Sequence, residues 1–82
     1  SAISPDKLKD PESVAYELLG IFKKNNPTAL EKEYGLNTDL DPEELLLEFG
    51  KKRCMLMKGG IVDERRAAIQ LLTDWHNGKI RI

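Results

Sequence analysis

Cysteine and histidine occur only once each in this chain, as Cys54 and His76. A single cysteine excludes an intramolecular disulfide, and a structural zinc site needs four protein ligands that this pair does not supply. No apolar run approaches the roughly 18 residues of a membrane-spanning helix. With a length of 82 residues, the chain is expected to form one small domain with no metal site and no membrane partner.

The patterns of a nucleotide site or a nucleophilic active site are also missing. Gly59-Gly60 is too short a glycine run to form a P-loop. A lone histidine gives no support for a Ser-His-Asp arrangement, and His76 is expected to be a partly exposed structural side chain. Cys54 is expected to be a small buried side chain rather than a reactive thiol. We therefore expect no enzyme activity from this chain itself and no cofactor bound to it.

Charge is abundant and unevenly distributed. The 13 Lys and Arg and 14 Asp and Glu residues leave a net charge of −1. Residues 1–50 hold five lysines against eleven acidic residues (−6), whereas residues 51–82 hold eight basic residues against three acidic ones (+5). This asymmetry favours a surface that attracts polyanions. The alternative explanation is that the two halves form ordinary charged surfaces exposed to solvent, with no polyanion bound.

Start and stop signals divide the first half of the chain into two helices. Asp10-Pro11 is a typical N-cap followed by Pro at the first helical position, and Asn25-Asn26-Pro27 is a break. Thr28 and Glu31 form a capping box that predicts a short second helix ending at Gly35. Apolar residues at three- and four-residue steps predict the buried face of the first helix: Val14, Ala15, Leu18, Leu19 and Phe22.

A third helix is predicted over about residues 42–54. Asp41-Pro42 repeats the start signal of the first helix, and the helix runs out into a basic stretch that suits the negative end of its dipole. Its apolar positions are Leu45, Leu46 and Phe49, with Leu47 on the flank.

The last helix is predicted to begin after Asp63, which is placed to cap it. Val62 and Ala67 fit a hydrophobic staple, and Asn77-Gly78 ends the helix. Residues 79–82 alternate like a short extended tail. The apolar stripe of this helix is Ala68, Leu71, Leu72 and Trp75, with Ile69 beside it.

These signals predict an all-α fold, a small bundle of four or five short helices with an extended C-terminal tail. Residues 1–9 are expected to be a linker and residues 10–82 a single helical domain. Since the chain begins with Ser rather than Met, we expect it to be a piece of a longer protein.

Six basic residues surround a Gly-Gly pair in the stretch KKRCMLMKGGIVDERRAA, residues 51–68. The predicted helix–turn–helix path folds them toward one end of the helix pair. Glycines let a phosphate approach the backbone closely, and free amides at a helix start favour anions. The candidate phosphate-binding residues are Lys51, Lys52, Arg53, Lys58, Gly59, Gly60, Arg65 and Arg66, extended by Lys79 and Arg81 if the tail folds back.

A plainer explanation is that the glycines form only a tight turn and that the arginines pair with acids or cover the core. No aromatic residue is interleaved with the basic ones except Trp75, which is expected in the core. Any RNA contact is therefore expected to follow shape and backbone rather than base sequence. The acidic half, with Glu43, Glu44 and Glu48, offers an alternative surface for a protein partner.

The stretches DPESVAYELLG, NPTALEKEYGL and DPEELLLEFGKKRCMLMKGGIVDERRAAIQLLTDWHNGKI resemble the C-terminal domain of the circularly permuted ribosome-assembly GTPases, the YlqF/RbgA group. The resemblance covers about residues 10–82. Its most specific parts are the Lys58-Gly59-Gly60 turn, the helix start Asp63-x-x-Arg66-Ala67-Ala68, and the motif Asp74-Trp75-x-x-Gly78-Lys79.

The resemblance implies an ANTAR-like helical domain that follows a GTPase domain in a cytoplasmic protein. It implies binding to ribosomal RNA on the maturing large subunit, with the ribosome assembly intermediate and the protein's own GTPase domain as further partners. GTP and Mg²⁺ would bind to the GTPase domain. The family's basic residues fall on Lys52, Arg53, Arg66 and Lys79, and its turn falls on residues 58–60.

The chain departs from the family pattern in three places. Cys54 stands where bacterial members usually have Gly, and a Gly often found before the terminal Arg is missing. Trp75 stands where bacterial members usually have Phe, and Trp is more similar to the nucleostemin-like relatives. These differences blur the lineage and hence the compartment, but they do not alter the basic cluster. The hypothesis is a ribosomal-RNA-binding domain of a GTPase that assists large-subunit assembly. The alternative is a protein-interaction domain that docks on the GTPase domain or a ribosomal protein through its acidic half.

Overall fold

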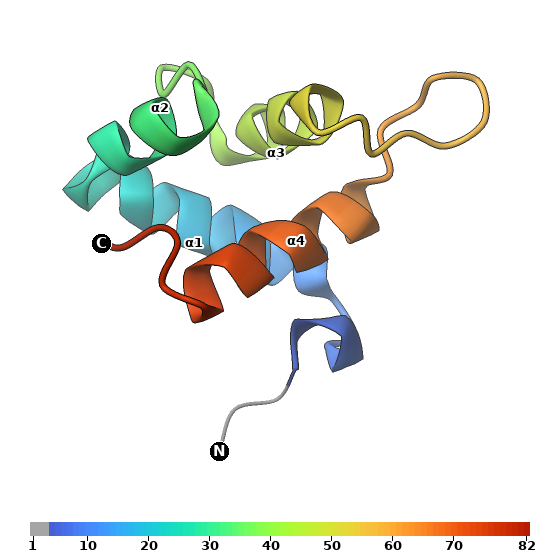
Figure 1. The fold of residues 1–82 in the computed structure, drawn as a ribbon, viewed down its shortest axis with the longest axis horizontal. Helices are drawn as coiled ribbons and strands as arrows, with labels where there is room; N and C mark the ends of the chain where they lie inside the picture. Colours follow the sequence, from blue (N-terminus) through green and yellow to red (C-terminus); the bar gives the residue numbers. More distant parts are fainter. Residues whose placement is uncertain (1–3) are drawn as a thin grey trace.

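A computed structural model describes residues 4–82, and in this range the chain is all-helical (Figure 1). The elements in chain order are η1 (Pro5–Lys7), a single 3-10 turn, α1 (Pro11–Asn25), α2 (Pro27–Tyr34), α3 (Pro42–Lys52) and α4 (Glu64–His76). No named strand is present in this range, so the predicted small helical bundle is confirmed. None of its helices combines the length and the apolar character needed to cross a membrane.

Aspartate side chains begin three of the four α-helices. Asp10 accepts a hydrogen bond from the backbone N–H of Ser13, and Asp41 accepts one from that of Glu44. Asp63 begins α4 in the same way. Each cap satisfies an amide that the helix itself leaves unpaired, and is worth about 1 kcal/mol. The predicted starts of α1, α3 and α4 are confirmed.

The predicted capping box at the start of α2 is wrong. Pro27 occupies the first position of the helix, so Asn26 is the N-cap and Thr28 lies inside the first turn. Proline's fixed φ suits a helix start, and the N-cap therefore lies at Asn26, two residues before the predicted Thr28. The Glu31 carboxylate instead accepts a hydrogen bond from the Thr38 hydroxyl at 2.6 Å.

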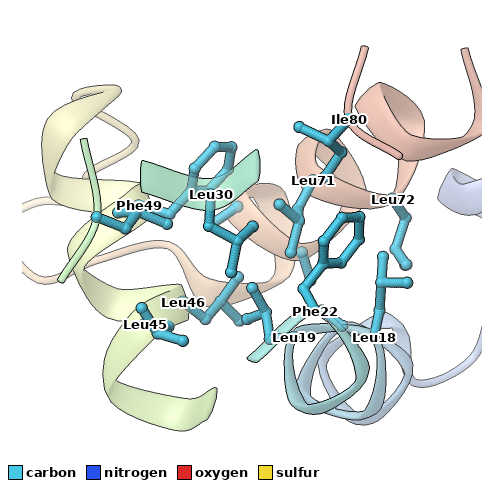
Figure 2. Packing of buried hydrophobic residues seen from close by; sticks show 14 of the residues in the cluster. Leu18, Leu19, Phe22, Leu30, Leu45, Leu46, Phe49, Leu71, Leu72 and Ile80 are labelled. Carbon is cyan, nitrogen blue, oxygen red and sulfur yellow. The ribbon is translucent and has the colours of Figure 1, made fainter. Parts of the chain in front are cut away.

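The core lies where α1 crosses α3 and α4, with α2 closing one end. Figure 2 shows side chains from all four α-helices pointing into one interior, joined by Ile80 from the tail. Phe22 and Phe49 are fully buried, and truncation of such a side chain costs about 3–5 kcal/mol. The cluster comprises Ala15, Leu18, Leu19, Phe22, Leu30, Leu36, Leu45, Leu46, Phe49, Met55, Ala67, Ala68, Leu71, Leu72 and Ile80.

Two residues predicted for the core are exposed. Val14 is 40% exposed and Trp75 is 44% exposed. They lie with Ile21 and Ile82 along an apolar groove between α1 and α4. The helical period places these positions beside the buried stripe, but no fifth helix covers that edge in the described part of the chain. Periodicity marks an apolar face and does not say whether another element covers it.

Helix α3 ends at Lys52, two residues earlier than predicted, and Cys54 is exposed rather than buried. The reason is the backbone: Cys54 has φ 55°, in the left-handed region that ends helices and that glycine adopts at the least cost. Residues 5–9, expected as linker, lie against α4, and Leu8 packs on the core. The division between linker and domain stays a prediction.

A buried carboxylate ties the far end of α4 to α2. Asp74 accepts hydrogen bonds from the Tyr34 hydroxyl at 2.7 Å and the Gln70 amide at 2.8 Å. The Lys79 ammonium stands 4.0 Å from the same carboxylate. Burial of the phenol, together with its hydrogen bond to Asp74, raises the pKa of Tyr34 above its usual range. All polar atoms of this buried group are thereby satisfied.

Candidate nucleic-acid interface

Residues 53–63, which we call the Gly-Gly loop, join α3 to α4 and project away from the helices (Figure 1). Its two arms pair as a short antiparallel ribbon. Leu56 forms a bridge with Val62, the Met57 N–H donates to the Ile61 carbonyl at 2.6 Å, and the Asp63 N–H donates to the Met55 carbonyl at 2.8 Å. The loop is therefore a held structure rather than a free connection.

The tip of the Gly-Gly loop is a tight turn, as predicted. The Gly60 N–H donates to the Met57 carbonyl at 3.1 Å, which places Lys58 and Gly59 at the two central positions. Gly59 has φ 88° and Gly60 has φ 79°, conformations that favour glycine. No atom lies within 4 Å of the point where a Cβ would stand on either glycine. The backbone of the tip is thus open to close approach.

The base of the loop is fixed by a glycine that the sequence analysis did not single out. A Cβ on Gly50 would stand 2.5 Å from Cγ1 of Val62 and 3.3 Å from Cβ of Ala67. Val62 and Ala67 are both buried, and their common approach to Gly50 agrees with the predicted staple. The return arm of the loop therefore packs directly on the backbone of α3.

Four candidate cations of this region are exposed and form no side-chain hydrogen bond, ion pair or cation–π contact among the described residues: Lys51, Lys52, Lys58 and Arg66. Lys52 is turned toward α2, so the other three are the ones near the loop. Lys58 is at the loop tip, while Lys51 and Arg66 flank its base in the adjoining helices. Lys51 shares the rim of a shallow pocket with Glu44 and Glu48, which offsets part of its charge. Lys58 and Arg66 are the more available pair.

The other cations near the loop have contacts within the protein. The Arg65 guanidinium donates to the carbonyls of Leu8 (3.2 Å) and Lys9 (3.4 Å), so it holds the N-terminal segment against α4. The Arg53 guanidinium lies 5.7 Å from the centre of the Phe49 ring, within cation–π range. These two arginines support the fold at the base of the loop.

Lys52 points toward α2 instead of the loop. Its ammonium lies 3.8 Å from the point where a Cβ on Gly35 would stand. Gly35 is the left-handed residue that ends α2, so the ammonium lies near the negative end of that helix dipole.

The tail cations lie at the opposite end of α4. The tail folds back onto the end of α1, where Asn26 Nδ2 donates to the Arg81 carbonyl at 2.8 Å. Arg81 Nε donates to the Gly78 carbonyl at 3.3 Å, and Lys79 faces Asp74. A helix of this length spans about 20 Å. The tail therefore does not extend the surface at the Gly-Gly loop.

The start of α4 is not the free anion site that the sequence favoured. The Asp63 carboxylate accepts the Arg66 N–H at 3.1 Å and so fills the capping position itself. Glu64 adds a second acidic residue to the first turn. Two carboxylates at this helix start oppose the approach of another anion.

Sequence reasoning missed the apolar side chains of the loop. Leu56 is 43% exposed, Met57 51% and Ile61 64%. The stretch Met55-Leu56-Met57 was available as a signal, but periodicity does not tell an exposed apolar arm from a buried one. In the described range, no three His, Cys, Asp or Glu side chains gather in a way that would hold a metal ion.

The chain is similar along most of its length to parts of two GTP-binding proteins. It is 29% identical over 79 residues to the uncharacterized GTP-binding protein MJ1464 of Methanocaldococcus jannaschii, covering 96% of this chain and 21% of that protein. It is 35% identical over 89 aligned positions to the GTPase grn1 of Schizosaccharomyces pombe, covering 98% and 19%. The chain spans about a fifth of these curated relatives. No family model and no solved structure matches it.

Proposed function

We propose that this chain is the RNA-binding C-terminal domain of a GTPase of the YlqF/RbgA type that assists assembly of the large ribosomal subunit. The observation that carries the proposal is the Gly-Gly loop: an open glycine turn with a cation at its tip and cations at its base, none of them hydrogen-bonded or ion-paired through its side chain within the described residues. A surface of this kind suits the phosphates of a polyanion. The similarity to GTP-binding proteins over most of the chain supports the assignment.

In this proposal GTP and Mg²⁺ bind to another domain of the full protein. The residues described here do not fit the nucleotide: the glycine turn lacks the length of a P-loop. The domain contributes binding rather than catalysis, and its partners are large-subunit ribosomal RNA, the assembly intermediate and the GTPase domain, in the cytoplasm.

The test compares two variants that lose the same charge. One is Lys51→Gln/Lys58→Gln/Arg66→Gln at the loop, and the matched control is Lys7→Gln/Lys24→Gln/Lys32→Gln, three exposed lysines elsewhere. Binding to a fragment of large-subunit ribosomal RNA is measured across a salt series. We expect the loop variant to bind more weakly. Its plot of log affinity against log salt concentration should be shallower by roughly 0.7–0.9 per lost phosphate contact, while the control should stay near the parent chain. Equal slopes in both variants would contradict the proposal.

A second candidate function follows from the acidic half. Helix α3 and the turn before it form a shallow pocket lined by Leu40, Glu44, Leu47, Glu48 and Lys51. We infer that this face would suit a basic protein, such as a ribosomal protein, or the GTPase domain. Binding of a purified basic ribosomal protein, with no affinity for RNA, is the result that this alternative predicts.

A further inference from the structure

The Gly-Gly loop carries apolar side chains that nothing covers in the described part of the chain. Ile61 is the most exposed of the large apolar side chains there, at 64%, and Met57 follows it on the same loop at 51%. A projecting apolar pair of this kind favours association, and such surfaces on soluble domains commonly mark binding sites.

The backbone holds this pair in one place. Because Leu56 bridges Val62, the next residues along each arm, Met57 and Ile61, stand opposite one another. The hydrogen bond between them, 2.6 Å long, closes the ribbon just before the turn. Opposite residues of an antiparallel ribbon share a face, and their Cβ atoms are about 5 Å apart. Lys58 follows directly at the tip, so a cation and an apolar pair occupy one end of the loop.

The surrounding charge indicates what kind of partner covers this pair. Lys58 at the tip and Arg66 at the base have no partner among residues 4–82. Arg66 shares the first turn of α4 with the carboxylates of Asp63 and Glu64 and offsets part of their charge, whereas Lys58 stands at the tip of the loop. The pair therefore favours a polyanion that approaches from the tip. A continuous RNA duplex offers phosphates and riboses to such a loop but keeps its bases stacked. Unpaired bases expose apolar faces, and these are the surfaces in RNA against which Met57 and Ile61 can be buried.

We infer that the Gly-Gly loop binds RNA at a bulge or internal loop, with Lys58 and Arg66 on phosphates and with Met57 and Ile61 against unstacked bases. This inference rests on the proposed function, since it names the class of RNA that the same site takes. It requires no base-specific hydrogen bond and therefore agrees with readout of shape.

The experiment uses the whole chain and two RNA probes: a 12-base-pair duplex, and the same duplex with a three-nucleotide bulge. The parent chain is expected to bind the bulged RNA about tenfold more tightly, the ratio that burial of roughly 60 Å² of apolar surface gives. The variant Met57→Ser/Ile61→Ser is expected to lose that preference and keep its affinity for the duplex. The matched control is Ile21→Ser/Ile82→Ser, which removes exposed apolar side chains from another face and is expected to keep the preference.

The variant Lys58→Gln/Arg66→Gln distinguishes failure of RNA binding by the loop from failure of the preference for unpaired bases. It is expected to weaken binding to both probes and to leave their ratio unchanged. If it binds both RNAs as the parent does, the proposed function fails. If it loses affinity but Met57→Ser/Ile61→Ser keeps the full preference for the bulge, only the further inference fails. Equal affinity of the parent chain for both probes would also overturn the inference.

Discussion

The two ends of α4 both carry basic residues but hold them differently. At the tail end, Lys79 faces the Asp74 carboxylate and Arg81 donates to the Gly78 carbonyl. At the loop end, Lys58 and Arg66 have no partner in the described range. The net charge of +5 over residues 51–82 therefore overstates the surface that a polyanion meets. Whether a cation is already held within the protein matters more than how many cations are present.

The largest effect on the free energy of unfolding is expected at the tail end of α4, where a buried carboxylate stabilises the fold. Replacement of Asp74 by Ala removes the acceptor of the Tyr34 hydroxyl and the Gln70 amide, both drawn into this buried group. Loss of a buried acceptor shared by two donors costs about 2–3 kcal/mol. Urea unfolding of Asp74→Ala measures this cost, beside the exposed control Asp39→Ala, which should stay within about 0.5 kcal/mol of the parent. A loss below about 1 kcal/mol in Asp74→Ala would remove the distinction between the two ends.

The next effect concerns the loop end, where packing rather than charge fixes the geometry. Gly50→Ala adds a Cβ at 2.5 Å from Cγ1 of the buried, stiff Val62. Overpacking of this kind costs about 1–3 kcal/mol, more than the roughly 1 kcal/mol that Ala gains over Gly in a helix. We expect a net loss of stability, measured by urea unfolding.

Gly20 supplies the control for this prediction, because a Cβ there would meet its nearest atom, of Pro42, at 3.9 Å. Gly20→Ala is expected to stabilise the chain by up to about 1 kcal/mol. The double variant Gly50→Ala/Val62→Ala should recover part of the loss seen in Gly50→Ala. A stabilising Gly50→Ala would show that the return arm of the loop does not pack on α3.

The sequence was sufficient for the parts of the fold that depend on local chemistry. The Asp-Pro pairs and the glycine after Tyr34 fix three of the helix boundaries, because caps and left-handed residues act within a few positions. Val14 and Trp75 were misplaced because their burial depends on whether another element covers that edge, which no local pattern encodes. Arg65 was grouped with the binding cations because its partners, Leu8 and Lys9, lie more than fifty residues away in the chain.

The candidate site also has parts that the sequence predicted and parts that it did not. The turn at residues 58–60 followed from composition, since paired glycines mark a positive-φ turn. The exposure of Met57 and Ile61 did not follow, because an apolar arm is buried or exposed according to where the ribbon projects. Only the three-dimensional arrangement separates the available cations from those that support the fold.

A smaller effect is expected at Cys54, which ends α3 in the left-handed region at φ 55°. A side chain with a Cβ pays about 1 kcal/mol or more for that conformation, so Cys54→Gly is expected to stabilise the chain by up to about 1 kcal/mol in urea unfolding. Cys54→Ala keeps the strained conformation and should change the free energy of unfolding by less than about 0.5 kcal/mol. Equal effects of Gly and Ala would show that the backbone at the loop entrance is not strained.

The smallest effect is expected from the hydrogen bond that ties the loop end of α4 to α1. The Tyr16 hydroxyl donates to Glu64 at 2.8 Å, and this bond to a carboxylate raises the pKa of Tyr16 to about 12. Because the folded-state pKa lies above the usual 10, the bond's stabilisation is fully present below pH 10. It is lost as the pH rises from 10 through 12. For a partly exposed bond the contribution is below about 1 kcal/mol.

The measurement is the difference in unfolding free energy between the parent chain and Tyr16→Phe at a series of pH values from 7 to 12. All other ionisable groups are the same in both chains, so their effects cancel in the difference. We expect a constant difference up to about pH 10 and a decline toward zero above it. A difference that stays constant to pH 12 would mean that the Tyr16 hydroxyl does not donate to Glu64. The loop end of α4 would then be held without this bond, by the packing of Val62 and Ala67 on Gly50 and by the hydrogen bonds of Arg65.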